Sequence, residues 1–271
     1  MFNFSTITTL VFVLFLNQSC KKNVTTPNQP QTDKPVTEVE MTLEYNKSSK
    51  PILFEFTSTG CPGCGSWGKP TFNQLIKEYD SAIVPLAVHI KYGDPMITPI
   101  SEAIAANRYG SIYTPQLWVN DSNGLVLNNN SINGSQSVRN LRNLINYQLT
   151  LELPKIAVQK RLNQNKIDVK YGVKWDQSFS NKNFYLSCYL TQNGNSHNQT
   201  SSPSNPTIHN YVIREANNGT WGNQLIANNA IDNEFKGSFN IDPNAYSSYE
   251  IVVVLWEKIN DRYRAVASQK I

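Results

Sequence analysis

The sequence predicts an α/β domain over residues 41–150, followed by an all-β domain over residues 151–271. In the first segment, apolar runs of strand length alternate with stretches in which apolar residues recur at helical spacing. After about residue 155 the helical spacing stops, and short strands follow at near-regular intervals. A chain of 271 residues is long enough for each segment to bury a core of its own.

The stretch from Phe2 to Leu16 is mostly apolar and predicts an export signal over residues 1–20. It is too short for a membrane span, which needs about 20 apolar residues. It ends in Ser19-Cys20, a small residue directly before a cysteine, and so resembles the lipobox of bacterial lipoproteins. That resemblance implies that Cys20 is lipidated and becomes a membrane anchor. A signal cleaved without lipidation and an uncleaved anchor are the alternatives.

Residues 21–40 contain three prolines and few large apolar side chains. Such a composition cannot form a core, so we expect a flexible tether. The α/β segment that follows is expected to contain strands at 51–57, 83–90, 116–120 and 124–127 and helices at 64–79, 99–109 and 137–149.

The second segment is expected to contain strands at 155–162, 166–175, 183–192, 208–215, 235–241, 249–257 and 263–270. Seven strands of this kind are typical of an immunoglobulin-like β-sandwich. Phe184, Leu186 and Cys188 alternate with more polar residues, which is the period of a half-buried strand. Cys188 is therefore predicted to point into the core, where a free cysteine packs as a small apolar side chain.

Cys61-Pro62-Gly63-Cys64 lies where an apolar strand passes into a helix. Two thiols at this spacing can exchange a disulfide with another protein. At a helix start, unpaired backbone N–H groups and the helix dipole favour the thiolate of the first cysteine. The motif therefore predicts a redox site that needs no cofactor beyond the Cys61–Cys64 disulfide.

Three features give the first segment a resemblance to thioredoxin: the cysteine pair, Glu55 six residues before it, and the stretch around Thr114-Pro115. The resemblance implies that Cys61, on the exposed side of the helix start, is the nucleophile and that Cys64 resolves the mixed disulfide. It implies further that Glu55 is a buried acid exchanging a proton with Cys64. Pro115 would be cis, so that Thr114 could pair with an extended substrate strand.

The exported chain also resembles the outer membrane protein 28 family of Bacteroidota, through three segments: His209 to Arg214, Gly219 to Gly222, and Ile251 to Trp256. The resemblance implies an outer-membrane-anchored lipoprotein facing the periplasm or the cell surface. A thioredoxin-like domain would then precede a β-rich domain. The expected partners of the protein are the thiols and disulfides of envelope proteins, and the membrane through the lipid anchor.

Other interpretations remain open. The formal net charge of +4 is scattered, with no basic block, so a nucleic acid is not an expected partner. The pair could be half of a zinc site, but Cys188 and the three histidines show no paired ligand spacing, so no metal is predicted. Cys61 and Cys64 could instead form a permanent disulfide, and Glu55 could be an ordinary surface glutamate. The chain would then be an envelope binding protein with a thioredoxin-like scaffold.

Overall fold

The computed structural model describes residues 40–271 except 92, 112, 130, 176–181 and 226–232, and residues 40–271 form one compact unit. The predicted signal with Cys20, and all of the predicted tether but its last residue, lie outside the described residues. In the described part, no helix is long and apolar enough to cross a membrane.

The elements before residue 150 follow the predicted alternation of strands and helices. They are β1 (Ile52–Thr57), η1 (Cys64–Gly68), α1 (Lys69–Tyr79), η2 (Asp80–Ala82), β2 (Val84–His89), α2 (Pro99–Ala106), β3 (Gln116–Val119), β4 (Ser122–Asn123), β5 (Leu127–Asn128), β6 (Ser131–Ile132) and α3 (Gly134–Leu149). Two helices begin at side-chain caps. Thr98 forms a capping box with Ser101 at α2, and Asn133 accepts from the Gln136 N–H at α3.

The elements after residue 150 are almost all strands. They are β7 (Lys155–Asn163), β8 (Lys166–Lys174), β9 (Phe184–Gln192), β10 (Asn195–His197), β11 (Thr207–His209), β12 (Val212–Asn217), β13 (Asn223–Gln224), β14 (Asn233–Asn240), η4 (Pro243–Ser248), β15 (Tyr249–Ile259) and β16 (Arg262–Lys270). The strand expected at 208–215 is divided into β11 and β12, because Tyr211 between them has φ +60°. The strand expected at 124–127 is replaced by the short β4 and β5.

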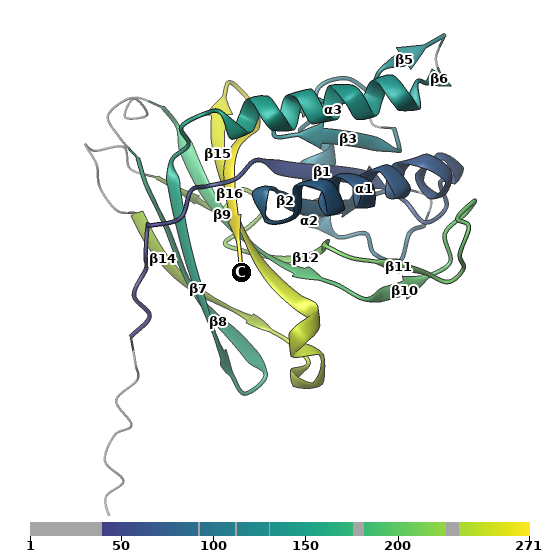
Figure 1. The fold of residues 1–271 in the computed structure, drawn as a ribbon. Helices are drawn as coiled ribbons and strands as arrows, with labels where there is room; N and C mark the ends of the chain where they lie inside the picture. The colour runs from purple at the N-terminus through teal and green to yellow at the C-terminus, as the bar shows by residue number, and fades with distance from the viewer. Residues whose placement is uncertain (1–39, 92, 112, 130, 176–181, 226–232) are drawn as a thin grey trace, which may run out of the picture. The chain divides into compact units, whose positions relative to one another are not determined.

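One nine-stranded sheet runs through the unit in the order β16-β15-β9-β12-β2-β1-β3-β4, with β13 also paired to β9 (Figure 1). β1 is parallel to β2 and antiparallel to β3. The helices α1 and α3 pack on one face of these strands, in a cluster that includes Leu53, Phe72 and Leu141. The helix α2 packs on the opposite face, through Ile104.

A second sheet, in the order β14-β8-β7, lies against β9, β15 and β16 (Figure 1). The two sheets enclose a core that includes Tyr171, Phe184 and Cys188. Cys188 is fully buried, which confirms its predicted position. In coarse form, the carboxy-terminal half is thus two packed sheets, as the strand pattern indicates.

The sequence separates residues 41–150 from residues 151–271, whereas the structure joins them. β12 lies parallel to β2, and the Ala87 N–H donates to the Tyr211 carbonyl at 2.8 Å. The two segments also share a core, in which the rings of Phe54 and Trp256 lie 6.1 Å apart. The described unit is therefore a mixed α/β fold in which one sheet of the carboxy-terminal half continues into the sheet of the amino-terminal half.

Candidate functional site

The cysteine pair lies in a turn between β1 and α1, as the sequence predicts. Cys61 and Cys64 form a disulfide, with Cα atoms 5.2 Å apart. The Cys64 N–H donates to the Cys61 carbonyl at 3.2 Å and lies 3.1 Å from the Cys61 Sγ. Residues 64–68 form a π-helical turn before α1, a feature that is frequent at functional sites. We call residues 58–65 the redox turn.

Both cysteines are buried. Cys61 is 4% exposed and Cys64 is fully enclosed. The expectation that Cys61 lies on the exposed side of the helix start is therefore wrong. Cys61 is buried because a segment far along the chain covers it. The Thr200 N–H donates to the Thr59 carbonyl at 2.9 Å, so the β10–β11 hairpin (residues 195–209) lies on the redox turn.

The loop before β3 forms a second wall of the site. The Thr114–Pro115 peptide bond is cis, and Pro115 is buried. A Cβ added at Gly63 would lie 3.1 Å from Pro115 Cδ, and one at Gly68 would lie 2.7 Å from Pro115 Cβ. The glycines thus allow the proline ring to approach the helix start closely. Among the described residues, no hydrogen bond engages the backbone groups of Thr114.

Glu55 is a buried acid in the centre of β1, not a surface glutamate. It is 2% exposed, and its Oε1 has no hydrogen-bond partner among the described residues. It shares a face of β1 with Leu53, which packs with α1. Burial raises the pKa of Glu55 above its ordinary value, although the charges of Lys69 and His89 act in the opposite direction. A raised pKa favours the protonated, neutral form of the carboxyl group.

The three histidines of the chain gather beside the redox turn, an arrangement that the sequence does not reveal. The His89 Nδ1 lies 2.7 Å from Asp94 Oδ2, which also accepts from the Thr59 N–H at 2.7 Å. The His209 ring meets His89 edge-on at 5.2 Å, and His197 lies 6.5 Å from His209. Burial raises the pKa of Asp94, but the hydrogen bond and charge of His89, together with the N–H groups of Met96 and Thr59, outweigh it, and the pKa lies below the ordinary value. The pair links the end of β2 to the redox turn.

These histidines do not form a metal centre. Within the described ranges, no group of three or more histidine, cysteine, aspartate or glutamate side chains is placed to hold a metal ion.

The comparisons with known proteins bear on the fold. No protein-family model matches the chain, and no curated protein matches it. Among solved structures, HBP35 of Porphyromonas gingivalis matches with a TM-score of 0.64 at 15% identity, over 83% of this chain and 75% of that one. The fold is similar to that of HBP35. At this level of identity the likeness shows the fold alone.

Two further matches are partial. A domain of the outer membrane lipoprotein Omp28 from P. gingivalis matches at 18% identity, over 45% of this chain and 92% of that one, with a TM-score of 0.29. A DUF3823 family protein from Bacteroides ovatus matches at 15% identity, over 44% and 53%, with a TM-score of 0.23. TM-scores this low do not establish a shared fold. The neighbours thus come from Porphyromonas and Bacteroides, and membership of the outer membrane protein 28 family stays a prediction.

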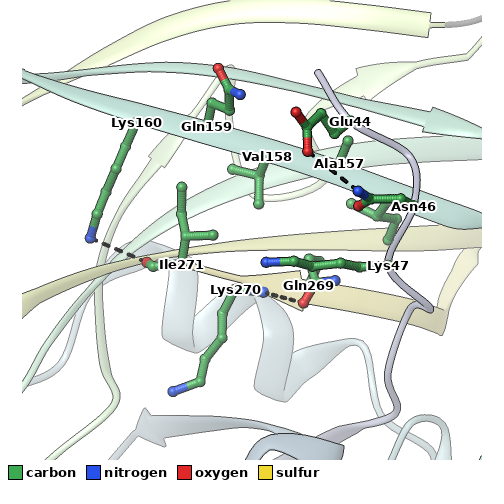
Figure 2. A pocket seen from close by; sticks show the side chains of 11 residues that line it. Glu44, Asn46, Lys47, Ala157, Val158, Gln159, Lys160, Gln269, Lys270 and Ile271 are labelled. Carbon is green, nitrogen blue, oxygen red and sulfur yellow. Dashed lines mark hydrogen bonds between the residues drawn. The ribbon is translucent and has the colours of Figure 1, made fainter. Parts of the chain in front are cut away.

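A separate hollow of about 320 Å³ lies between β7 and β16 (Figure 2). Figure 2 shows Lys160 reaching the carbonyl of Ile271, to which its Nζ donates at 3.3 Å. Burial lowers the pKa of Lys160. None of the site residues expected from the sequence lines this hollow. The candidate site is therefore the redox turn with Pro115, Glu55 and the β10–β11 hairpin.

Sequence reasoning missed the residue that closes this site. Gln199 is 1% exposed, and its Nε2 donates to the carbonyls of Ser58, Thr59 and Cys61, each at 3.1 Å. It stands in a polar stretch rich in serine and asparagine, which reads as an exposed loop. No local pattern in the sequence distinguishes it from its neighbours.

Proposed function

We propose that the protein is a thiol-disulfide oxidoreductase of the cell envelope, with a thioredoxin-like arrangement around Cys61 and Cys64. The observation that carries the proposal is the Cys61–Cys64 disulfide at the start of a helix, with the ring of Pro115 packed against that helix start. The order β2-β1-β3, with β1 parallel to β2 and antiparallel to β3, supports it. So does the placement of α1 and α3 on one face and α2 on the other.

The reaction begins when a thiolate of a client dithiol attacks the Cys61 Sγ. A bond forms between the client sulfur and Cys61, and the Cys61–Cys64 bond breaks with its electron pair on the Cys64 Sγ. Cys64 takes up one proton as it leaves. Glu55 suits this transfer because its raised pKa favours the protonated form.

The second thiolate of the client then attacks the client sulfur of the mixed disulfide. Cys61 departs as a thiolate, stabilised by the Cys64 N–H that lies 3.1 Å from its sulfur. The client has lost two electrons and gained a disulfide, and the cysteine pair has gained the two electrons. The reverse sequence reduces a client disulfide, so the potential of the pair sets the direction.

The client would lie beside the loop of Thr114 and Pro115. In the described part of the chain the backbone groups of Thr114 make no hydrogen bonds, so they are available to an extended client strand. Such pairing holds a client by its main chain and accepts many side chains. This suits a protein with several envelope substrates.

Export and lipidation through Cys20 are part of the same proposal. The supporting observations are the apolar stretch from Phe2 to Leu16, the Ser19-Cys20 pair shortly after it, and the proline-containing segment that follows. An outer-membrane anchor would place the redox site in the periplasm or at the cell surface. Fatty-acid labelling that is lost in Cys20→Ser tests the anchor.

One observation favours a second candidate, in which the disulfide is structural and the protein is an envelope binding protein. Both cysteines are buried, with Cys61 only 4% exposed, and structural disulfides resist reduction. This candidate predicts function that does not depend on Cys61.

The reduction potential of the pair in glutathione buffers separates the two candidates. A value between about −120 and −270 mV with rapid exchange supports the oxidoreductase, whereas a value below about −300 mV with slow exchange supports the structural disulfide. Cys61→Ser should abolish the redox transition in these buffers, because it removes the disulfide. Cys188→Ala, which removes the fully buried cysteine of the other core, should leave it intact and so serves as the matched control.

A further inference from the structure

The β10–β11 hairpin is the part of the molecule that limits access to Cys61. Its tip is ordered by internal hydrogen bonds: the Gln199 N–H donates to Asn205 Oδ1 at 2.8 Å, and the Thr207 hydroxyl donates to Ser202 Oγ at 2.9 Å. At its base, His209 packs edge-on against His89. The tip therefore lies on the redox turn as a preformed unit, and the hairpin is held at its base against His89 at the end of β2.

Gln199 is the main polar link between the hairpin and the redox turn. Its Nε2 is shared among three carbonyls, those of Ser58, Thr59 and Cys61, at 3.1 Å each. The Cys61 carbonyl also accepts from the N–H groups of Cys64 and Gly65. Without Gln199, the carbonyls of Ser58 and Thr59 would lose a buried donor, which carries a free-energy cost.

Gly65 permits this contact by having no side chain. A Cβ at this position would overlap the Thr200 carbonyl oxygen, and would lie 2.8 Å from Ser202 N and 3.0 Å from Gln199 Cγ. Two of these neighbours are backbone atoms, which cannot turn aside as the end of a side chain can. Any larger residue at Gly65 must therefore push the hairpin away from the redox turn.

Disulfide exchange requires the incoming sulfur to approach Cys61 Sγ in line with the Cys61–Cys64 bond. With Cys61 4% exposed, a small thiol needs far less displacement of the surrounding chain than a thiol carried on a polypeptide. We propose that the β10–β11 hairpin determines which thiols react with Cys61, and that Gln199 is the positioning residue that holds it in place. This inference rests on the proposed function, because it assigns a specificity determinant to the same reaction.

The test compares two reductants of the Cys61–Cys64 disulfide in the full chain: dithiothreitol as the small dithiol, and reduced, unfolded ribonuclease as the protein dithiol. Gln199→Met removes the donor while keeping side-chain length, and Gly65→Ala displaces the hairpin from the opposite side. Leu162→Ala, at a position on β7 that is 42% exposed and outside the candidate site, is the control. Far-UV circular dichroism and thermal unfolding establish that each variant is folded.

We expect the rate constant for the protein dithiol to rise about fivefold or more in Gln199→Met, as the loss of one net hydrogen bond implies. Gly65→Ala should have the same effect or a larger one. The rate constant for dithiothreitol should change much less, and Leu162→Ala should match the wild type with both reagents. Equal acceleration with both reagents, or none with either, would overturn the proposal.

Failure of the proposed function gives a different result. If the potential identifies a structural disulfide while the ratio of the two rate constants still changes in both variants, the hairpin controls access but the oxidoreductase proposal is wrong. If the potential is that of a catalytic pair and the ratio stays constant, the hairpin proposal alone is wrong.

Discussion

Acidification should destabilise the fold through His209, the buried histidine at the end of β11. This side chain is 2% exposed, and its Nε2 has no hydrogen-bond partner among the described residues. Burial is the largest cause that lowers its pKa to about 3, and the charges of Lys69 and His89 add to it, whereas Asp94 opposes the shift. The folded chain therefore keeps His209 neutral at pH values where a free histidine is protonated.

The sign and size of the effect follow from linkage. In the unfolded chain, histidine has a pKa of about 6.5. The unfolded state therefore takes up the proton first as the pH falls, so stability declines from about pH 6.5 towards about pH 3. A pH of 5 lies about 1.5 units below the pKa of the unfolded histidine. At 1.36 kcal/mol per unit, the free energy of unfolding falls by about 2 kcal/mol. At pH 7 the loss is near zero.

Urea unfolding at pH 7 and pH 5 measures this difference directly. The wild type should lose about 2 kcal/mol more between the two pH values than His209→Phe, which keeps a ring in the same place but cannot be protonated. Carboxylates such as Asp94 contribute to the loss in both proteins and cancel in the comparison. Ile208→Ala, next to His209 on β11, should lose as much as the wild type. Equal losses in wild type and His209→Phe, with unchanged m-values, would refute a buried neutral histidine.

Two further substitutions test the redox site and the β-rich half. Burial raises the pKa of Glu55 despite Lys69 and His89, so its contribution to stability falls as the pH rises past its unfolded pKa of about 4.3. The Tm of Glu55→Gln relative to the wild type should therefore be higher at pH 8 than at pH 4, and the variant should exchange disulfides more slowly. A Tm difference that is lower at pH 8 would contradict the buried-acid interpretation. In the β-rich half, Gly222 and Gly194 both have positive φ. A Cβ at Gly222 would overlap the Leu186 carbonyl oxygen, whereas a Cβ at Gly194 would have no atom within 4 Å. Gly194→Ala should lower the free energy of unfolding by about 1 kcal/mol through backbone strain. Gly222→Ala should lower it clearly more, as measured by chemical denaturation. Equal losses would show that β9 shifts to make room for the added methyl group.

The sequence alone determined the elements and the redox motif. Apolar periodicity placed β1, α1, β2 and six of the seven strands expected after residue 155 close to their observed bounds, whereas the strand expected at 208–215 is divided and the short β10 and β13 were not expected. Periodicity succeeds here because each of these elements buries one face or both, and burial imposes a repeat of 2.0 or 3.6 residues on the chain. The position of Cys61 and Cys64 at a strand-to-helix junction, and the inward orientation of Cys188, follow from the same local signals.

Only the tertiary structure decided how the two halves meet. The pairing of β12 with β2 joins residues far apart in the sequence, and it adds a continuous sheet and a shared cluster to the cores that each half keeps. Gln199 reaches the carbonyls of the redox turn from a polar loop that has no periodic pattern. The burial of Cys61, and the gathering of three histidines beside it, are consequences of that meeting. Such contacts depend on distances between elements, which a local sequence pattern does not encode.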